Sequence, residues 1–126
     1  TNEVNYLGNN TFSVVSPYES IGEYLVLTED EKQDELKERI RQTIYAFRPS
    51  FLSYVTDIDE SVFEAIQSNE KYEANNEPLL YLVEGTCGLD YLIEEAVEWD
   101  GAGHFLSDYD GIEHELENNI YAYRIG

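Results

Sequence analysis

Most of the residues that could do chemistry gather in one short loop, residues 100–111, which reads DGAGHFLSDYDG. Asp108 and Asp110 have the spacing of positions three and five of an EF-hand calcium loop, but position one would be Leu106, which cannot bind a cation. The segment after the loop also has the pattern of a strand rather than a helix. We therefore expect turn residues that bond to nearby backbone amides. A weak, irregular cation site among Asp108, Asp110 and Glu113 is the alternative.

His104 and His114 are the two candidate transition-metal ligands. Ten residues separate them, which matches none of the ligand spacings of zinc sites. In the hairpin predicted below, His114 faces Tyr123 on the apolar side, so we expect a buried, hydrogen-bonded histidine. His104 follows two nearby glycines and suits the C-terminal cap of a helix. The sequence thus predicts no metal and no cofactor.

Paired carboxylates and the single cysteine are the remaining candidates for catalysis. Acid–base chemistry needs two carboxyl groups with separated pKa values, and Asp57 with Asp59 or Glu95 with Glu98 could be proposed. With 27 acidic residues among 126, however, such pairs arise by chance. Cys87 has no basic neighbour to stabilise a thiolate and reads as a packing residue. We assign no catalytic residue and expect a protein that is not an enzyme.

Hydrophobic periodicity predicts about four helices. The clearest extends from Glu29 to Phe47, because Thr28 and Glu31 form a capping box and acidic residues fill the first turn. Further helical segments are predicted to begin at Pro49, at Asp59 or Ser61, and at Pro78 as a first helical residue, and another helix is predicted from Leu89 to Asp100. Residues 68–77 are predicted to form a polar loop.

The C-terminal stretch, residues 112–125, predicts a β-hairpin. Asn118 and Asn119 suit a two-residue type I′ turn, which requires positive φ angles. Folding there pairs Leu116 with Tyr121, His114 with Tyr123, Ile112 with Ile125, and, on the other face, Glu113 with Arg124. Short strands are also expected at Thr11–Val15 and at Tyr24–Leu27, although the second could instead begin the long helix. The fold class is therefore α+β: about four helices packed on a small antiparallel sheet with the C-terminal hairpin, in a single domain, residues 1–126.

The charge is strongly acidic and uneven. Seven basic residues against 27 acidic ones give a net charge of −20. Residues 1–48 carry nine acids and five bases, whereas residues 49–126 carry eighteen acids and two bases, Lys71 and Arg124. Such a field repels the phosphates of nucleic acids and anionic lipids and favours basic partners. Solubility alone is the competing explanation of the acidity.

The C-terminal third resembles a set of short uncharacterised proteins of phages and of prophage-bearing or marine bacteria. The residues that carry the resemblance are LIEEAVEWDGAGHFLSDYDG, followed by EHEL and YAYRI, about 35 residues in all. The chain departs from the pattern at Ala102, where a basic residue is expected. The resemblance implies a context, a phage or mobile element, rather than an activity. It also implies that His104, Tyr109, Asp110 and their neighbours form a structural corner.

We expect an acidic accessory protein, not an enzyme, that binds a basic protein partner. A specific form of this hypothesis is a nucleic-acid mimic that blocks a DNA- or RNA-binding enzyme. The expected partner surface consists of Glu60, Glu64, Asp90, Glu94, Glu95 and Glu98. The alternative is a small enzyme or ligand-binding domain centred on His104, Tyr109, Asp110, Glu113 and Arg124. The chain shows no signal-peptide pattern, and its apolar runs are too short to span a bilayer, so we expect a cytoplasmic protein that binds neither membrane nor nucleic acid.

Overall fold

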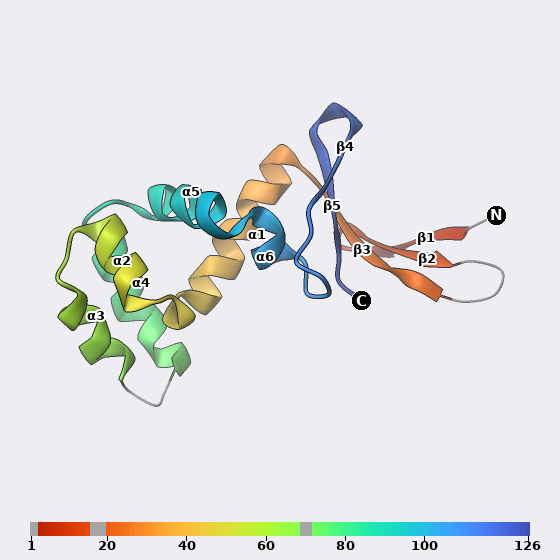
Figure 1. Ribbon diagram of the computed structural model, residues 1–126. Helices are drawn as coiled ribbons and strands as arrows, with labels where there is room; N and C mark the ends of the chain where they lie inside the picture. The colour runs from red at the N-terminus through yellow and green to blue at the C-terminus, as the bar shows by residue number, and fades with distance from the viewer. Residues whose placement is uncertain (1–2, 16–19, 69–71) are drawn as a thin grey trace. The chain divides into compact units, whose positions relative to one another are not determined.

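The computed structural model describes residues 3–15, 20–68 and 72–126, apart from the side chains of residues 15, 20 and 21 (Figure 1). Six helices and a five-stranded antiparallel sheet make up the described chain, so the α+β class is confirmed and the helix number exceeds the predicted four. The chain divides into two compact units. We call Thr1–Leu36 with Asp100–Gly126 the sheet unit and Lys37–Trp99 the helical unit. Within the described ranges, no helix is long and apolar enough to cross a membrane.

The sheet unit contains every described strand. In spatial order the sheet runs β1 (Glu3–Gly8), β2 (Thr11–Val15), β3 (Ser20–Thr28), β5 (Ile120–Arg124) and β4 (His114–Leu116). All neighbouring strands are antiparallel. The predicted strand at Thr11–Val15 is confirmed, and Tyr24–Leu27 belongs to β3 rather than to the helix that follows.

The first strand is absent from our sequence-based expectation, although its turn carries a clear signal. Asn9 and Asn10 connect β1 to β2 with φ angles of 52° and 62°. Gly8 pairs with Thr11 across this two-residue connection. Two successive positive φ angles match the twist of paired strands, and asparagine tolerates them better than most residues. An Asn-Asn dipeptide therefore builds a hairpin at this end of the sheet.

The core of the sheet unit lies where β3 pairs with β5. Leu25 stands opposite Tyr123 and Leu27 opposite Tyr121, and all four side chains are buried. Alternation along β3 directs these leucines to one face, as the period of two in a strand requires. The remaining buried apolar side chains of this unit are Leu36, Ala102, Leu106 and Ala122.

The C-terminal hairpin is confirmed, but its predicted register is wrong by one residue. His114 pairs with Ala122 and Leu116 with Ile120, so three residues, 117–119, connect β4 to β5. Asn118 and Asn119 do adopt positive φ angles of 60° and 56°. The shift reverses the expected environments: His114 is exposed rather than buried against Tyr123. It also separates Glu113 from Arg124, since Glu113 turns toward Lys32 and Tyr123 instead.

Helix α1 (Glu29–Thr43) begins as predicted. The Thr28 amide donates to Glu31 Oε1 at 2.9 Å, and the Glu31 amide donates to Thr28 Oγ1 at 3.3 Å. This reciprocal capping box satisfies two amides that the helix itself leaves unpaired. The helix ends earlier than predicted, and a 3₁₀ turn, η1 (Ile44–Ala46), continues the chain.

The helical unit packs four further α-helices around its apolar side chains. These are α2 (Pro49–Thr56), α3 (Glu60–Gln67), α4 (Asn76–Glu84) and α5 (Leu89–Asp100), with a 3₁₀ turn, η2 (Tyr72–Asn75), before α4. The core consists of Ile40, Ile44, Leu52, Val55, Phe63, Leu79, Val83, Leu89, Leu92, Ile93 and Ala96. Pro49 begins α2, and Asp59 caps α3 by accepting from the Ser61 amide at 2.9 Å, as predicted.

Two predicted boundaries are wrong. Helix α4 begins at Asn76, because the Asn76 side chain accepts from the Tyr45 amide and donates to the Gln42 carbonyl, which fixes the helix start two residues before Pro78. The expected loop at residues 68–77 thus contains η2 and the start of α4, and its residues 69–71 lie outside the described residues. In the sheet unit, a short helix, α6 (Ala102–Leu106), lies within the stretch predicted as a loop.

Candidate functional site

Asp110 closes the turn that follows α6. Its Oδ1 accepts from the Ile112 amide at 3.0 Å and from Ser107 Oγ at 2.9 Å. Ser107 is buried, and its one hydroxyl proton is shared with a second acceptor, the carbonyl oxygen of Arg124, which lies 2.6 Å from Oγ. The bond from Ile112, followed by that from Ser107, holds the pKa of the Asp110 carboxyl below its ordinary value. These bonds give Asp110 a structural role at the join between the turn and β5.

Arg124 stacks on Tyr109 from the same turn. Its guanidinium carbon lies 3.8 Å from the centroid of the Tyr109 ring, and its Nε donates to the Gly126 carbonyl at 3.0 Å. A guanidinium over an aromatic face is a favourable cation–π arrangement. Arg124 therefore helps to hold the turn against the last strand. The expected ion pair between Arg124 and Glu113 is not among those of the described residues, because Glu113 pairs with Lys32.

Glu113 belongs to a second, more buried group in the sheet unit. Its Oε2 lies 2.9 Å from Lys32 Nζ and accepts from the Tyr123 hydroxyl at 2.6 Å. Lys32 is itself nearly buried, with its Nζ 4.0 Å from the centroid of the Tyr121 ring. Burial and the bond to Glu113 raise the pKa of Tyr123, so its hydroxyl stays protonated and keeps donating. We call Lys32, Glu113, Tyr121 and Tyr123 the buried charge cluster.

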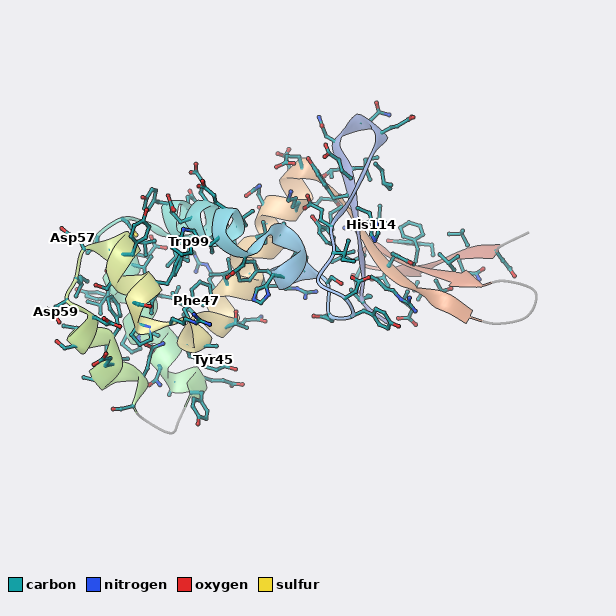
Figure 2. The ribbon with its side chains drawn as sticks, viewed as in Figure 1. Tyr45, Phe47, Asp57, Asp59, Trp99 and His114 are labelled. Atoms are coloured by element: carbon teal, nitrogen blue, oxygen red, sulfur yellow. The ribbon has the colours of Figure 1, made fainter. Side chains whose placement is uncertain are left out.

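His104 lies away from these bonds, on α6. It is exposed, and its ring meets that of Phe105 edge-on, with 4.9 Å between centroids. His114, labelled in Figure 2, is exposed on β4. Among the described residues, no three histidine, cysteine, aspartate or glutamate side chains gather closely enough to hold a metal ion. The residues proposed for a ligand site are thus divided between a hydrogen-bonded turn, the buried charge cluster and an exposed helix.

The residues of the predicted acidic surface lie on two helices of the helical unit. Glu60 and Glu64 occupy successive turns of α3, and the other four, Asp90, Glu94, Glu95 and Glu98, occupy α5. All are exposed except Glu95, which is half-buried. Asp90 lies 3.5 Å from Lys37 Nζ, an exposed pair. In the described part of the chain, Glu94 and Glu98 have no ion pair.

One of the two carboxylate pairs considered above for acid–base chemistry has a structural explanation. Asp57 and Asp59 flank the connection between α2 and α3 (Figure 2). Asp57 ends α2 in the left-handed conformation, and Asp59 accepts from both the amide and the hydroxyl of Ser61. These bonds lower the pKa of Asp59. The pair therefore serves to end one helix and begin the next.

Exposed aromatic side chains, which neither the charge pattern nor the apolar periodicity singles out, accompany the acids of α5. Trp99, at the end of α5, is 65% exposed, and its ring contacts those of Tyr54 and Phe51 of α2 at centroid distances of 5.8 and 6.2 Å (Figure 2). Tyr91 of α5 is also exposed, and it lies two helical turns before Trp99. We call Phe51, Tyr54, Tyr91 and Trp99 the aromatic face.

Acidic and aromatic side chains alternate along this side of α5. Tyr91, Glu95 and Trp99 follow one another at intervals of four residues, which places them on one side of a helix. Tyr91 hydrogen-bonds Glu95, whose charge raises the pKa of that phenol. Glu94 and Glu98 lie beside this line at intervals of three and seven residues from Tyr91. The four-residue spacing of Tyr91, Glu95 and Trp99 is visible in the sequence. The apolar periodicity that predicts the buried side of the helix does not include these positions.

This combination of groups suits the binding of an organic cation. Aromatic faces attract cations through the ring quadrupole, and carboxylates supply the opposite charge. The structure thus brings three of the six predicted acidic residues, Glu94, Glu95 and Glu98, into a surface with specific chemistry. It describes no contact that joins them to Glu60 or Glu64. The chain matches no family model, no curated protein and no solved structure.

Proposed function

We propose that this chain is a non-enzymatic interaction protein that binds a basic protein through the exposed side of α5. The observation that carries the proposal is the helix itself: one side is buried in the core, and the other presents Glu94, Glu95 and Glu98 beside exposed aromatic rings. Glu94 and Glu98 have no ion pair with any described residue, and carboxylates in that state keep their full attraction for a partner's cations. The net charge of −20 adds long-range steering toward such a partner.

The partner class follows from the same charges. Nucleic acids and anionic lipid surfaces are repelled, whereas a positively charged protein groove is attracted. A basic groove that ordinarily holds nucleic acid is one such target, so nucleic-acid mimicry is the specific form of the proposal that we favour. The resemblance of the C-terminal third to phage and prophage proteins agrees with this form, because mobile elements encounter host nucleic-acid enzymes in the cytoplasm.

Retention of basic proteins on the immobilised chain tests the proposal. We expect nucleic-acid-binding proteins to be retained from a bacterial lysate at low salt and released at high salt, because exposed charge pairs are screened. A purified retained protein should then bind the chain directly and be displaced by duplex DNA. The test variant replaces the α5 carboxylates by glutamine: Glu94→Gln, Glu95→Gln and Glu98→Gln. A control variant has the same charge change on η2 and α4: Glu73→Gln, Glu77→Gln and Glu84→Gln.

The two variants separate a specific surface from general acidity. The α5 variant should lose the partner, and the control should keep it. Equal retention by both would show that the attraction is not located on α5. If no nucleic-acid-binding protein is retained at low salt, the mimicry form of the proposal is wrong.

A further inference from the structure

We infer that the aromatic face binds an arginine side chain of the basic protein partner, with the guanidinium stacked on Trp99 and Tyr54 and paired with the carboxylates of α5. The inference rests on the proposed function and deepens it by naming the residue type that the surface recognises. It concerns the helical unit alone, in which all the residues involved lie.

The exposure of the rings is the first argument. Trp99 is 65% exposed and Tyr54 is 60% exposed, although the two rings contact each other. Large aromatic side chains dominate the energetics of interfaces, and a contiguous exposed group of them marks an interaction site more often than scattered single residues do. Phe51, which is half-buried, extends the group, since its ring contacts those of both Trp99 and Phe47.

The position of the carboxylates is the second argument. Glu95 lies between Tyr91 and Trp99 along one side of α5, and Glu98 follows Glu95 by three residues, which makes the two carboxylates neighbours on the helix surface. A purely apolar ligand would have to bury these charges without compensation, which is costly. A ligand that carries a positive charge on a flat, apolar-faced group satisfies the rings and the carboxylates together.

Arginine fits this description better than lysine. The guanidinium is planar and weakly hydrated, it stacks on aromatic faces, and its fork of N–H donors matches a carboxylate. An ammonium is compact and strongly hydrated, so it gains less from the rings. The same chain already contains a stack of this kind, since Arg124 lies over Tyr109 with 3.8 Å between the guanidinium carbon and the ring centroid.

Two short peptides test the inference. They have the same length and charge and differ only in carrying arginine or lysine, and each bears an uncharged fluorophore for anisotropy. Trp99 is the only tryptophan, so its fluorescence reports contact at this surface specifically. We expect the arginine peptide to bind more tightly and to change the Trp99 emission more than the lysine peptide does at equal saturation.

Variants locate the effect on the aromatic face. An exposed cation–π contact corresponds to a factor of roughly two to five in affinity, so Tyr54→Leu and Trp99→Leu should each weaken the arginine peptide by about that factor and leave the lysine peptide nearly unchanged. Tyr81→Leu is the matched control, because Tyr81 is an exposed tyrosine on α4 of the same unit. Circular dichroism of each variant checks that the fold is retained.

The outcomes distinguish the two proposals. If both peptides bind equally and the aromatic variants behave like Tyr81→Leu, then the surface attracts charge without recognising arginine, and only the inference is overturned. If neither peptide binds at low salt, the proposed function fails with it. Arginine preference that disappears in Tyr54→Leu and persists in Tyr81→Leu supports both.

Discussion

Replacing Glu113 by glutamine should destabilise the sheet unit, because it removes the negative member of the buried charge cluster. The substitution keeps the shape of the side chain but leaves Lys32 without its carboxylate at 2.9 Å. It also turns the bond from the Tyr123 hydroxyl, 2.6 Å long, into a neutral one. The lysine cannot easily recover water, since its side chain is only 11% exposed.

The expected cost follows from this burial. Breaking a fully buried ion pair on one side costs about 3–5 kcal/mol. The side chain of Glu113 is 28% exposed, so water enters part of the site, and the Tyr121 ring at 4.0 Å still stabilises the ammonium. We therefore expect Glu113→Gln to lower the free energy of unfolding by about 2 kcal/mol. Adding Lys32→Met should restore about half of the loss, because no unpaired charge remains buried.

Urea denaturation followed by circular dichroism measures these differences. The control is the exposed pair Lys37–Asp90, which is 3.5 Å long. Asp90→Asn should change the free energy of unfolding by less than about 0.5 kcal/mol. The reasoning is refuted if Glu113→Gln costs no more than Asp90→Asn, or if Lys32→Met adds a further loss to Glu113→Gln instead of compensating for it.

Three other predictions follow from local geometry. Gly103→Ala should destabilise the sheet unit by about 1–3 kcal/mol in thermal melts, since a Cβ there would lie 2.8 Å from the Glu113 amide nitrogen. Gly101→Ala is the comparison: no atom lies in the way of its Cβ, so only the positive φ angle strains that variant. Asp59→Ala should lower stability at neutral pH through loss of the α3 cap. Because the pKa of Asp59 is lowered in the folded chain, this difference from wild type should be present above about pH 4 and vanish as the pH falls further, as paired melts across pH will show. The hydrogen bond to Glu29 raises the pKa of Tyr121 to about 12. The stability that this bond contributes should therefore be complete below about pH 10 and lost as the pH rises through 12. Absorbance titration at alkaline pH should show one tyrosine that ionises late, and Tyr121→Phe should remove that late step.

The local signals in the sequence predicted local structure well. Thr28 and Glu31 form the predicted capping box, Pro49 begins a helix, and Asp59 caps the next, because each of these effects depends on residues within one turn of the chain. The α+β class and the C-terminal hairpin follow from hydrophobic periodicity in the same way.

The hairpin register could not be predicted from the hairpin alone. Cross-strand pairing favoured Glu113 opposite Arg124, but the stronger partners of Glu113 are Lys32 from α1 and the Tyr123 hydroxyl. Cross-strand pairing within the hairpin takes no account of a lysine that is distant in sequence. Conversely, Asn9 and Asn10 carry the same signal as Asn118 and Asn119, and equal treatment of the two dipeptides would have revealed β1.

The candidate site was predicted in part for a similar reason. Counting carboxylates identified Glu94, Glu95 and Glu98, since charge is visible in the sequence. The aromatic face requires Tyr54 of α2 beside Trp99 of α5, a contact between helices that periodicity within one helix does not reveal. Tyr91 and Trp99, in contrast, were available from their spacing with Glu95.

The pairing of β3 with β5 also has a consequence for the order in which the chain folds. Leu25 meets Tyr123 across a stretch that contains the whole helical unit, so this ladder closes only after residue 123 has been synthesised. Loop closure over such a distance is slow, whereas the contacts of helices α2 to α5 lie close in sequence. During translation, the edge of β3 that pairs with β5 therefore stays unpaired, and Leu25 and Leu27 lack their partners Tyr123 and Tyr121, until β5 has been synthesised. Open apolar strands invite pairing between neighbouring nascent chains, and the mutual repulsion of strongly acidic chains counteracts this.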